Sequence, residues 1–245
     1  MNSTPTALPP RPARPVADLR RIAGHLCLDF VNTLAWRGDD RPNERLARYG
    51  DLVTWCLGAG ALTPNDAKAL RGHAAAHPAA AEAVLVRARD LREALHRLFA
   101  GDPSAQRPGD LPAVNAELAR APARQRLGWQ DGGFAWPGEA GDAGAADLDR
   151  VLWPVVWSGV DLLVALPARG RRGRAIGRVK ACADATCGAL FYDASRNRSR
   201  RWCVMEDCGN RAKARRHYAR WKGREAKIQG PPATARNSRG KRSTG

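Results

Sequence analysis

The chain has 245 residues and carries 41 Lys and Arg against 24 Asp and Glu, a formal net charge of +17. This length is enough for one sizeable core and a small appended module, so we expect two domains. No run of 18 apolar residues occurs, which argues against a membrane-spanning helix, and the proline-rich residues 1–16 lack the apolar stretch of a signal peptide. We therefore expect a cytoplasmic protein.

The positive charge is concentrated at one end of the chain. Residues 1–167 contain 19 Lys and Arg and 19 Asp and Glu, whereas residues 168–245 contain 22 and five. A strongly basic segment beside a neutral domain is typical of a protein that binds a polyanion. Nucleic acid is favoured over a membrane surface, because no apolar helix face accompanies the cations.

The first part of the chain predicts a helical domain over residues 19–166, after a disordered leader over residues 1–18. Apolar residues at helical spacing predict a helix over Leu26–Trp36. Thr63 followed by Pro64 and Asp66 is typical of a helix start, with an N-cap, a proline in the first turn and an acid. Further helices are expected over Asp51–Leu57, from Pro64 to a point before Pro78, from Pro78 to Gly101 and over Leu111–Arg120.

The remaining elements include one hairpin and one long helix. Two aromatic segments around Asp131-Gly132, a pair that tolerates positive φ, predict a β-hairpin over residues 127–136. A helix is predicted over Ala145–Leu166, with a kink at Pro154 where the ring clashes with the carbonyl one turn earlier. We expect a basic linker over residues 167–179 and a disordered basic tail over residues 223–245.

Four of the six cysteines form the pattern Cys182-x4-Cys187 and Cys203-x4-Cys208, with fifteen residues between the two pairs. Zn²⁺ takes four thiolates in a tetrahedron, and two short cysteine loops brought together by a hairpin can supply them. The alternatives are two disulfides or four unrelated buried cysteines, which need an oxidising compartment or an apolar setting. The pattern favours one structural Zn²⁺ with no open coordination position.

The cysteine pattern and its surroundings predict a finger over residues 180–222. Strands are expected over Ala189–Asp193 and Arg200–Cys203, joined by a turn at Ser195–Ser199. A helix over Asn210–Lys222 follows the last cysteine, which gives a treble-clef-like or zinc-ribbon-like arrangement. The fold class is therefore mainly α with a small β-hairpin, followed by a small C-terminal zinc finger with four cysteine ligands. The residues expected to pack this helix against the hairpin are Ala214, Tyr218 and Trp221.

The cations of the finger are predicted to contact nucleic acid, mostly through phosphates, which position a protein without specifying sequence. Asn210 and Arg211 are sharper candidates, because Asn can pair with adenine and Arg with guanine. Asn210 could instead cap the helix, and Arg211 could pack on Trp202. The full predicted set is Arg196, Arg198, Arg200, Arg201, Asn210, Arg211, Lys213, Arg215, Arg216 and Arg220.

Several of these segments resemble known families. Cys208-Gly209-Asn210-Arg211, preceded by Ser199–Cys203 and Phe191–Ser195, resembles the bacterial CGNR zinc-finger family. Gly24–Thr33 together with Leu52–Trp55 resembles the ABATE domain that accompanies this finger. Proteins of this arrangement are regarded as candidate stress-induced transcription regulators, and have also been described as RNA-binding zinc-ribbon-like proteins.

The resemblance implies zinc ligation by Cys182, Cys187, Cys203 and Cys208, the residues that the spacing also selects. It further implies that Asp29, Asn32 and Thr33 belong to a signature of the N-terminal domain. These three residues could bind a small effector, or could satisfy buried backbone groups and tie helices together. Cys27 and Cys56 are expected to be ordinary core cysteines.

The leading functional hypothesis is a DNA-binding transcription regulator in which a helical sensor domain controls a zinc-stabilised reader. The alternative is an RNA-binding protein. RNA readers expose aromatic residues for stacking, and we interpret the aromatic residues of the finger as core, which favours duplex DNA. An enzyme is not expected, because four thiolates leave no open metal position and no catalytic motif is present. A homodimer is considered, because one finger reads few base pairs.

Overall fold

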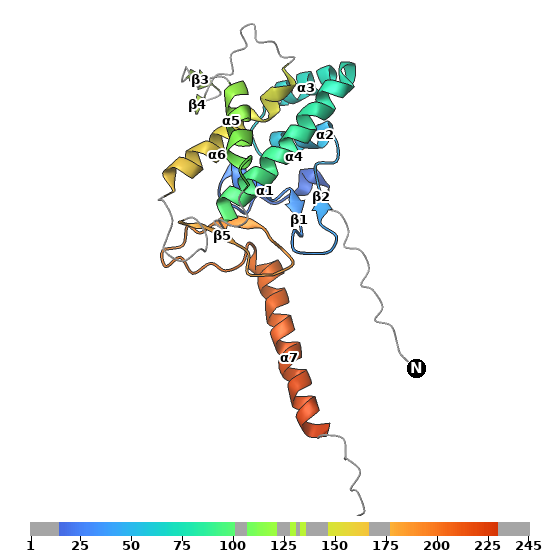
Figure 1. The fold of residues 1–245 in the computed structure, drawn as a ribbon, viewed down its shortest axis with the longest axis vertical. Coiled ribbons are helices and arrows are strands. Elements are labelled where there is room, and N and C mark those ends of the chain that lie inside the picture. Colours follow the sequence, from blue (N-terminus) through green and yellow to red (C-terminus); the bar gives the residue numbers. More distant parts are fainter. Residues whose placement is uncertain are drawn as a thin grey trace, which may run out of the picture.

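The computed structural model describes residues 15–100, 107–121, 128–130, 133–135, 147–166 and 177–229. Residues 1–14 of the predicted leader, 131–132 of the predicted hairpin, 167–176 of the predicted linker and 230–245 of the predicted tail lie outside the described residues. Residues 16–18 and 223–229, which were predicted to be disordered, are helical. A helical body lies above a small finger, and one long helix projects from the finger away from the body (Figure 1).

The helices of the body surround a common core. They are α1 (Leu26–Val31), α2 (Tyr49–Gly58), α3 (Pro64–Ala76), α4 (Pro78–Ala100), α5 (Asp110–Arg120) and α6 (Trp153–Ala165), with the 3-10 helices η1 (Val16–Asp18) and η2 (Leu148–Val151). We call the described residues from 15 to 166 the helical domain.

The strands of the described chain are short and pair as two-stranded antiparallel hairpins. They are β1 (Leu34–Ala35) with β2 (Asn43–Glu44), β3 (Gly128–Gln130) with β4 (Gly133–Ala135), and β5 (Val179–Ala181) with β6 (Leu190–Tyr192). We call residues 177–229 the finger; it continues after β6 with the π-helix η3 (Met205–Gly209) and with α7 (Asn210–Gln229). The predicted fold class is confirmed.

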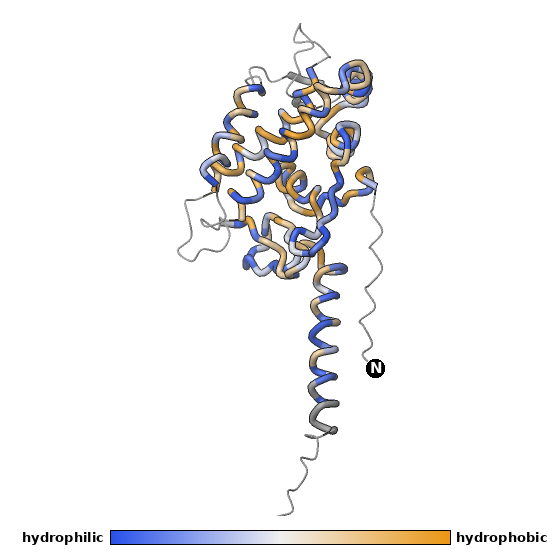
Figure 2. Tube along the Cα trace, turned by 45° about the vertical axis from the view of Figure 1, so that its right-hand side comes forward, coloured by the Kyte–Doolittle hydropathy of each residue, from blue (hydrophilic) through white to orange (hydrophobic). Residues whose placement is uncertain are grey.

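Helix α4 is the central element of the helical domain, since it contacts α1, α2, α3, α5 and both strands of the finger hairpin. Its apolar residues recur at helical spacing, and Leu85, Leu91, Leu95 and Phe99 are all at most 1% exposed. Figure 2 shows many apolar positions on the helices of the body, whereas the coloured part of α7 is mostly hydrophilic. Cys27 and Cys56 are buried in this core, as predicted.

The start of α3 agrees with the sequence analysis in detail. The Thr63 hydroxyl accepts a hydrogen bond from the Asp66 backbone N–H at 3.1 Å, and Asp66 Oδ2 accepts one from the Thr63 N–H at 3.2 Å. This capping box satisfies backbone donors that the first turn of a helix leaves without partners. Pro64 costs nothing at the first helical position, because its missing N–H would have no partner there.

The predicted helix over Leu26–Trp36 is too long, because α1 ends at Val31. Thr33 then turns the chain, with its hydroxyl donating to the Phe30 carbonyl at 2.7 Å, and β1 begins at Leu34. The buried guanidinium of Arg92 fixes this turn by donating to Thr33 Oγ1 and to both carboxylate oxygens of Glu44. Tertiary polar contacts therefore override the helical spacing of the apolar residues.

The kink predicted at Pro154 is also wrong. The chain forms η2, capped by the Asp147 side chain, and α6 begins at Trp153 with Pro154 in its first turn. A proline there needs no hydrogen-bond partner for its nitrogen, so the chain starts a new helix where a continuous one would bend. No helix in the described parts of the chain is both long and apolar enough to cross a membrane.

The finger packs directly against the helical domain. The Asn32 side chain pairs with the backbone of Leu190, donating to its carbonyl at 2.8 Å and accepting from its N–H at 2.9 Å. The Tyr192 N–H donates to the Ala23 carbonyl at 2.8 Å, and the Arg37 N–H donates to the Cys187 carbonyl at 3.2 Å. A Cβ atom on Gly38 would lie 2.0 Å from the Ala185 carbonyl oxygen, so only glycine fits at this contact.

We predict that Asn32→Ala lowers the free energy of unfolding by about 2 kcal/mol, because the Leu190 N–H and carbonyl each lose a partner at a partly buried site. Urea unfolding followed by circular dichroism measures this change. Asn115→Ala is the matched control, since Asn115 is an exposed asparagine on α5. Equal stability of the two variants would contradict the structural role of Asn32.

Candidate metal centre and nucleic-acid interface

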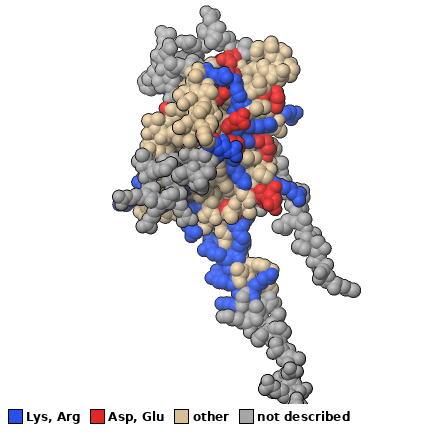
Figure 3. Space-filling model, in the orientation of Figure 1, with Lys and Arg blue, Asp and Glu red and all other residues tan. Residues whose placement is uncertain are grey.

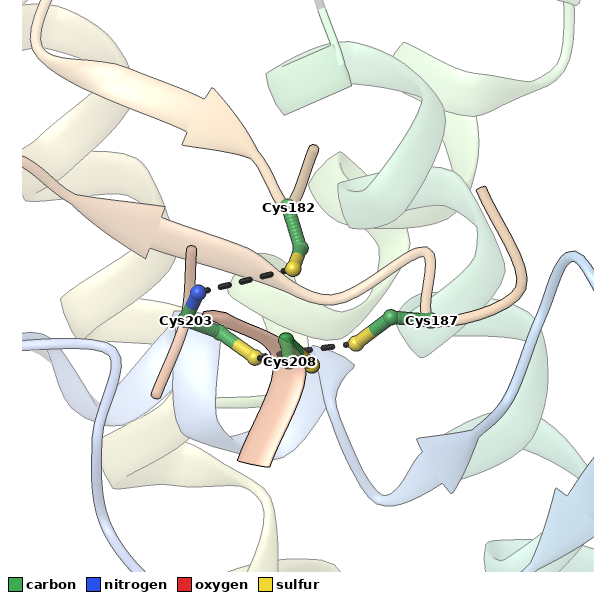
Figure 4. Close-up of side chains that lie close together, drawn as sticks. All are labelled: Cys182, Cys187, Cys203 and Cys208. Carbon is green, nitrogen blue, oxygen red and sulfur yellow. Dashed lines mark hydrogen bonds between the residues drawn. The ribbon is translucent and has the colours of Figure 1, made fainter. Parts of the chain in front are cut away.

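The structure brings the four predicted zinc ligands together in the finger. The sulfur atoms of Cys182, Cys187, Cys203 and Cys208 all lie within 4.8 Å of one another, and all four residues are buried. Figure 4 shows the side chains converging from separate segments of the finger. Cys203 Sγ lies 3.6 Å from Cys187 Sγ and 3.5 Å from Cys208 Sγ.

These distances fit a tetrahedral Zn²⁺ site. A Zn–S bond of about 2.3 Å places neighbouring sulfur atoms about 3.8 Å apart. None of the six cysteines of the chain forms a disulfide in the structure. The four thiolates would fill the coordination sphere, so a bound Zn²⁺ would stabilise the fold without offering a position to a substrate.

The first cysteine pair lies inside the β5–β6 hairpin, which differs from the prediction. Cys182 follows β5 and Cys187 precedes β6, so the hairpin encloses the first pair. Arg200–Cys203 is not a strand, and β6 pairs with β5 instead. The predicted turn is present, with the Arg198 N–H donating to the Ser195 carbonyl. The hairpin was misplaced because β5 lies in a Gly- and Arg-rich segment that has the composition of a linker.

The second cysteine pair leads into the projecting helix. Cys208 lies in η3, and α7 starts two residues later at Asn210, so the last ligand precedes the helix as predicted. A Cβ atom on Gly209 would lie 2.4 Å from Sδ of Met205, a flexible side chain that is 40% exposed and can move aside, so this contact alone does not require a glycine after the cysteine. The N-terminus of α7 favours the negative charge of a thiolate at this place.

A buried carboxylate, Asp184, fastens α7 to the first cysteine loop. Its side chain is fully buried and forms ion pairs with Arg211 Nε at 3.0 Å and with Arg215 Nη2 at 2.9 Å. Burial raises the pKa of Asp184, but the hydrogen bonds from Arg215 and Arg211 outweigh it, so that its pKa lies below the usual value. Asp184 was not among the predicted site residues. An acidic residue between two cysteines of a basic module could have identified it.

The Arg211 side chain makes its contacts within the protein. Its Nη2 donates to Cys208 Sγ at 2.8 Å, and its guanidinium lies 4.5 Å from the centre of the Trp36 ring. It therefore packs on an aromatic residue, as one interpretation held, although the partner is Trp36 and not Trp202. Asn210 donates to the Glu206 carbonyl at 2.9 Å and is exposed, so it bonds to η3 and does not act as an N-cap acceptor for α7.

Arg200 is likewise engaged between the two parts of the chain. Its Nη2 donates to the carbonyls of Ile22 and Cys203, and its guanidinium lies 4.3 Å from the centre of the Phe191 ring. The structure therefore does not place Arg200 with the cations that face solvent.

The other predicted cations of the finger are exposed. Arg196, Arg198 and Arg201 lie on or beside the turn after β6, and Arg201 also stacks on Trp202 at 5.1 Å. Lys213, Arg216 and Arg220 lie along α7, where Figure 3 shows a column of positive charge. Arg215 is half exposed despite its ion pair with Asp184.

The predicted packing of α7 against the hairpin is wrong. Ala214 is exposed, and the Tyr218 and Trp221 side chains are 55% and 49% exposed. The two rings stack on each other at 5.8 Å. The helix points away from the body, so its distal aromatic residues cannot reach the small core of the finger (Figure 1).

The three signature residues of the helical domain form internal hydrogen bonds. Asp29 Oδ1 accepts from the N–H groups of Ile22 and Ala23, while Asn32 and Thr33 bond as described above. These bonds satisfy backbone groups, in agreement with the structural interpretation. Burial, the largest effect, raises the pKa of Asp29.

We predict that Cys208→Ser lowers the zinc content of the purified protein from one ion per chain toward zero, which atomic emission can measure. Because the finger packs on α1 and α4, the midpoint of thermal unfolding of the helical domain should fall as well. Cys56→Ala is the control, since Cys56 lies in the helical core and should leave the zinc content unchanged. Full zinc content in Cys208→Ser would disprove the ligand assignment.

Asp184→Asn should loosen the base of α7, because it removes the charge that holds Arg211 and Arg215. We expect faster amide hydrogen exchange over residues 211–216, at unchanged zinc content. Asp207→Asn provides the comparison, because Asp207 is half exposed and only pairs with Arg20 at 3.6 Å. Identical exchange in the two variants would show that Asp184 does not fasten the helix.

Comparison with known protein families assigns both parts of the chain. Residues 24–166 match the ABATE family, described as "Putative stress-induced transcription regulator", and residues 178–221 match the CGNR zinc finger. No curated protein matches the chain. The match to the zinc finger and the four converging cysteines together indicate one structural Zn²⁺. The ABATE match covers more than half of the residues of the chain. The chain therefore belongs to the ABATE family, and it carries a CGNR zinc finger.

Proposed function

We propose that this protein is a cytoplasmic, zinc-dependent transcription regulator that binds duplex DNA through α7. The observation that carries this proposal is the projection of a basic helix from the zinc centre into solvent (Figure 3). An exposed basic helix attached to a helical domain with balanced charge is the charge distribution that is typical of proteins that bind nucleic acid.

The cations of α7 form a stripe. At 100° per residue, positions 213, 216, 220 and 224 fall within one side of the helix, and all of them are Lys or Arg. The side with Arg211 and Arg215 instead faces Asp184 at the base of the helix. The attachment to Asp184 thus leaves the stripe turned away from the ion pairs of the finger. Phosphate groups are the ligands that suit such a row of charges.

The shape of α7 favours duplex DNA over double-stranded RNA. A helix of 20 residues is about 30 Å long and about 10 Å wide, and the major groove of B-DNA is about 12 Å wide. The major groove of A-form RNA is too narrow for side chains to read. The exposed turn with Arg196 and Arg198 could add contacts to the DNA backbone.

Single-stranded RNA is the second candidate, and one observation favours it. Tyr218 and Trp221 are exposed and stacked, whereas the preference for DNA drawn from the sequence assumed that they were buried. Exposed aromatic rings next to cations are a feature of proteins that stack unpaired bases.

A catalytic role is not part of the proposal. A zinc ion held by four thiolates has no open position for a substrate or for an activated water.

Arg216→Ala combined with Arg220→Ala should weaken binding to any duplex and lower the slope of log affinity against log salt concentration by about 2, since each phosphate contact contributes about 0.9. Fluorescence anisotropy at several salt concentrations measures the slope. Arg41→Ala with Arg71→Ala is the matched control, because it removes the same charge from exposed positions of the helical domain.

The same assay decides between the candidates when a B-DNA duplex, an RNA duplex and single-stranded RNA compete. Tightest binding to the DNA duplex, with a lower slope only in the α7 variant, supports the proposal. Equal slopes in the two variants would contradict the role of α7, and a preference for single-stranded RNA that is lost in Trp221→Ala would replace DNA with the alternative.

A further inference from the structure

A pocket of about 360 Å³ lies where the helical domain meets the finger. Trp36 and Trp55 of the helical domain line it, together with Val204, Cys208 and Arg211 of the finger. We call it the seam pocket. Its volume lies in the range of small-molecule sites, and such sites are frequently found at domain interfaces.

The walls of the seam pocket suit a flat aromatic molecule. Leu19, Ile22 and Ala35 provide apolar surface beside the two indole rings. Trp55 is held in place by the core, where its ring lies 5.5 Å from Phe30. Trp36 is held by the guanidinium of Arg211, which lies 4.5 Å from its ring centre. Two fixed aromatic rings favour a planar ligand through offset stacking.

Arginines and aspartates both line the seam pocket, and the preference for a cation rests on one carboxylate, that of Asp29. Arg211 is bound to Asp184 and to Cys208, Arg20 pairs with Asp207 at the rim, and Arg45 has a partner as well. Asp29 differs from these residues, because both of its hydrogen bonds come from backbone N–H groups and use Oδ1 alone. Oδ2 is thus the atom of this carboxylate that can accept a bond from a ligand.

The metal centre adds to this preference. Cys187, Cys203 and Cys208 line the pocket, and four thiolates around one Zn²⁺ would leave a net negative charge on the centre, which Arg211 offsets in part through its hydrogen bond to Cys208. Burial raises the pKa of Asp29 and outweighs the hydrogen bonds from Ala23 and Ile22 and the nearby charges of Arg21 and Arg200, all of which lower it.

We propose that the seam pocket binds a small planar aromatic cation, whose protonated nitrogen donates to Asp29 Oδ2 while its ring packs beside Trp36 and the edge of Trp55 that lines the pocket. The site does not depend on the identity of the nucleic acid. A ligand there would touch the helical domain and, through Arg211, the first turn of α7.

The test is calorimetric titration of the zinc-loaded full chain with 2-aminobenzimidazole, a planar aromatic cation. Indole-3-carboxylate serves as the anionic counterpart and guanidinium as the cation without an aromatic ring. We expect saturable binding of the aromatic cation and none of the other two. The absence of saturable binding up to about 10 mM, or tighter binding of the carboxylate, would overturn the proposal.

Two variants locate the binding. Asp29→Asn keeps the Oδ1 acceptor for Ile22 and Ala23 but removes the charge, and it should weaken binding at least about tenfold. Ala35→Leu fills the pocket and should have a similar effect. Zinc content and circular dichroism verify that both variants are folded. Wild-type affinity in both folded variants would place the binding elsewhere and overturn the proposal.

Discussion

The convergence of four cysteines on one point is the constraint on which the finger depends. The segments that meet there are a short hairpin, an irregular loop and a π-helix, none of which buries enough apolar surface to be stable alone. A tetrahedral metal site fixes all of them at once, because each ligand restrains its own segment. Asp184 and Arg211 support the cysteine cluster from outside. The Asp184 carboxylate accepts a hydrogen bond from Arg211, and Arg211 donates another to the Cys208 sulfur.

The finger and the helical domain share more than a linker. The side chain of Asn32 behaves like a strand neighbour for Leu190, and the Ala23 carbonyl accepts from Tyr192 of the same strand. Polar groups of the helical domain thus complete the edge of the finger hairpin, which would otherwise face solvent. This arrangement explains why the signature residues of the helical domain lie near the finger. It also places the seam pocket where a ligand would contact both the helical domain and the finger.

The elements that could be predicted from the sequence are those with local determinants. The start of α3 is fixed by Thr63, Pro64 and Asp66, and α4 by its apolar periodicity. The zinc ligands follow from spacing alone. The end of α1 could not be predicted, because it depends on Arg92, which is distant in sequence. The position of β5 could not be predicted, because the segment that leads into it has the composition of a linker. The roles of Arg200 and Arg211 were missed for a related reason: a sequence does not reveal which cations have internal partners.

Helix α7 is exposed because it has little apolar surface to pack and is held by tertiary contacts at its base. A helix that is polar on every side gains little from packing, and its like charges four residues apart, such as Arg216 and Arg220, oppose helix formation. Its first turns are nevertheless fixed, because α7 follows directly after Cys208 and because Asp184 pairs with the side chains of Arg211 and Arg215, which lowers the cost of nucleation. Beyond Arg215 this support ends, and the distal turns rely on propagation against charge repulsion. A polyanion alongside the stripe would relieve that repulsion, so the features that make α7 unfavourable in isolation are the features that suit it to a row of phosphates.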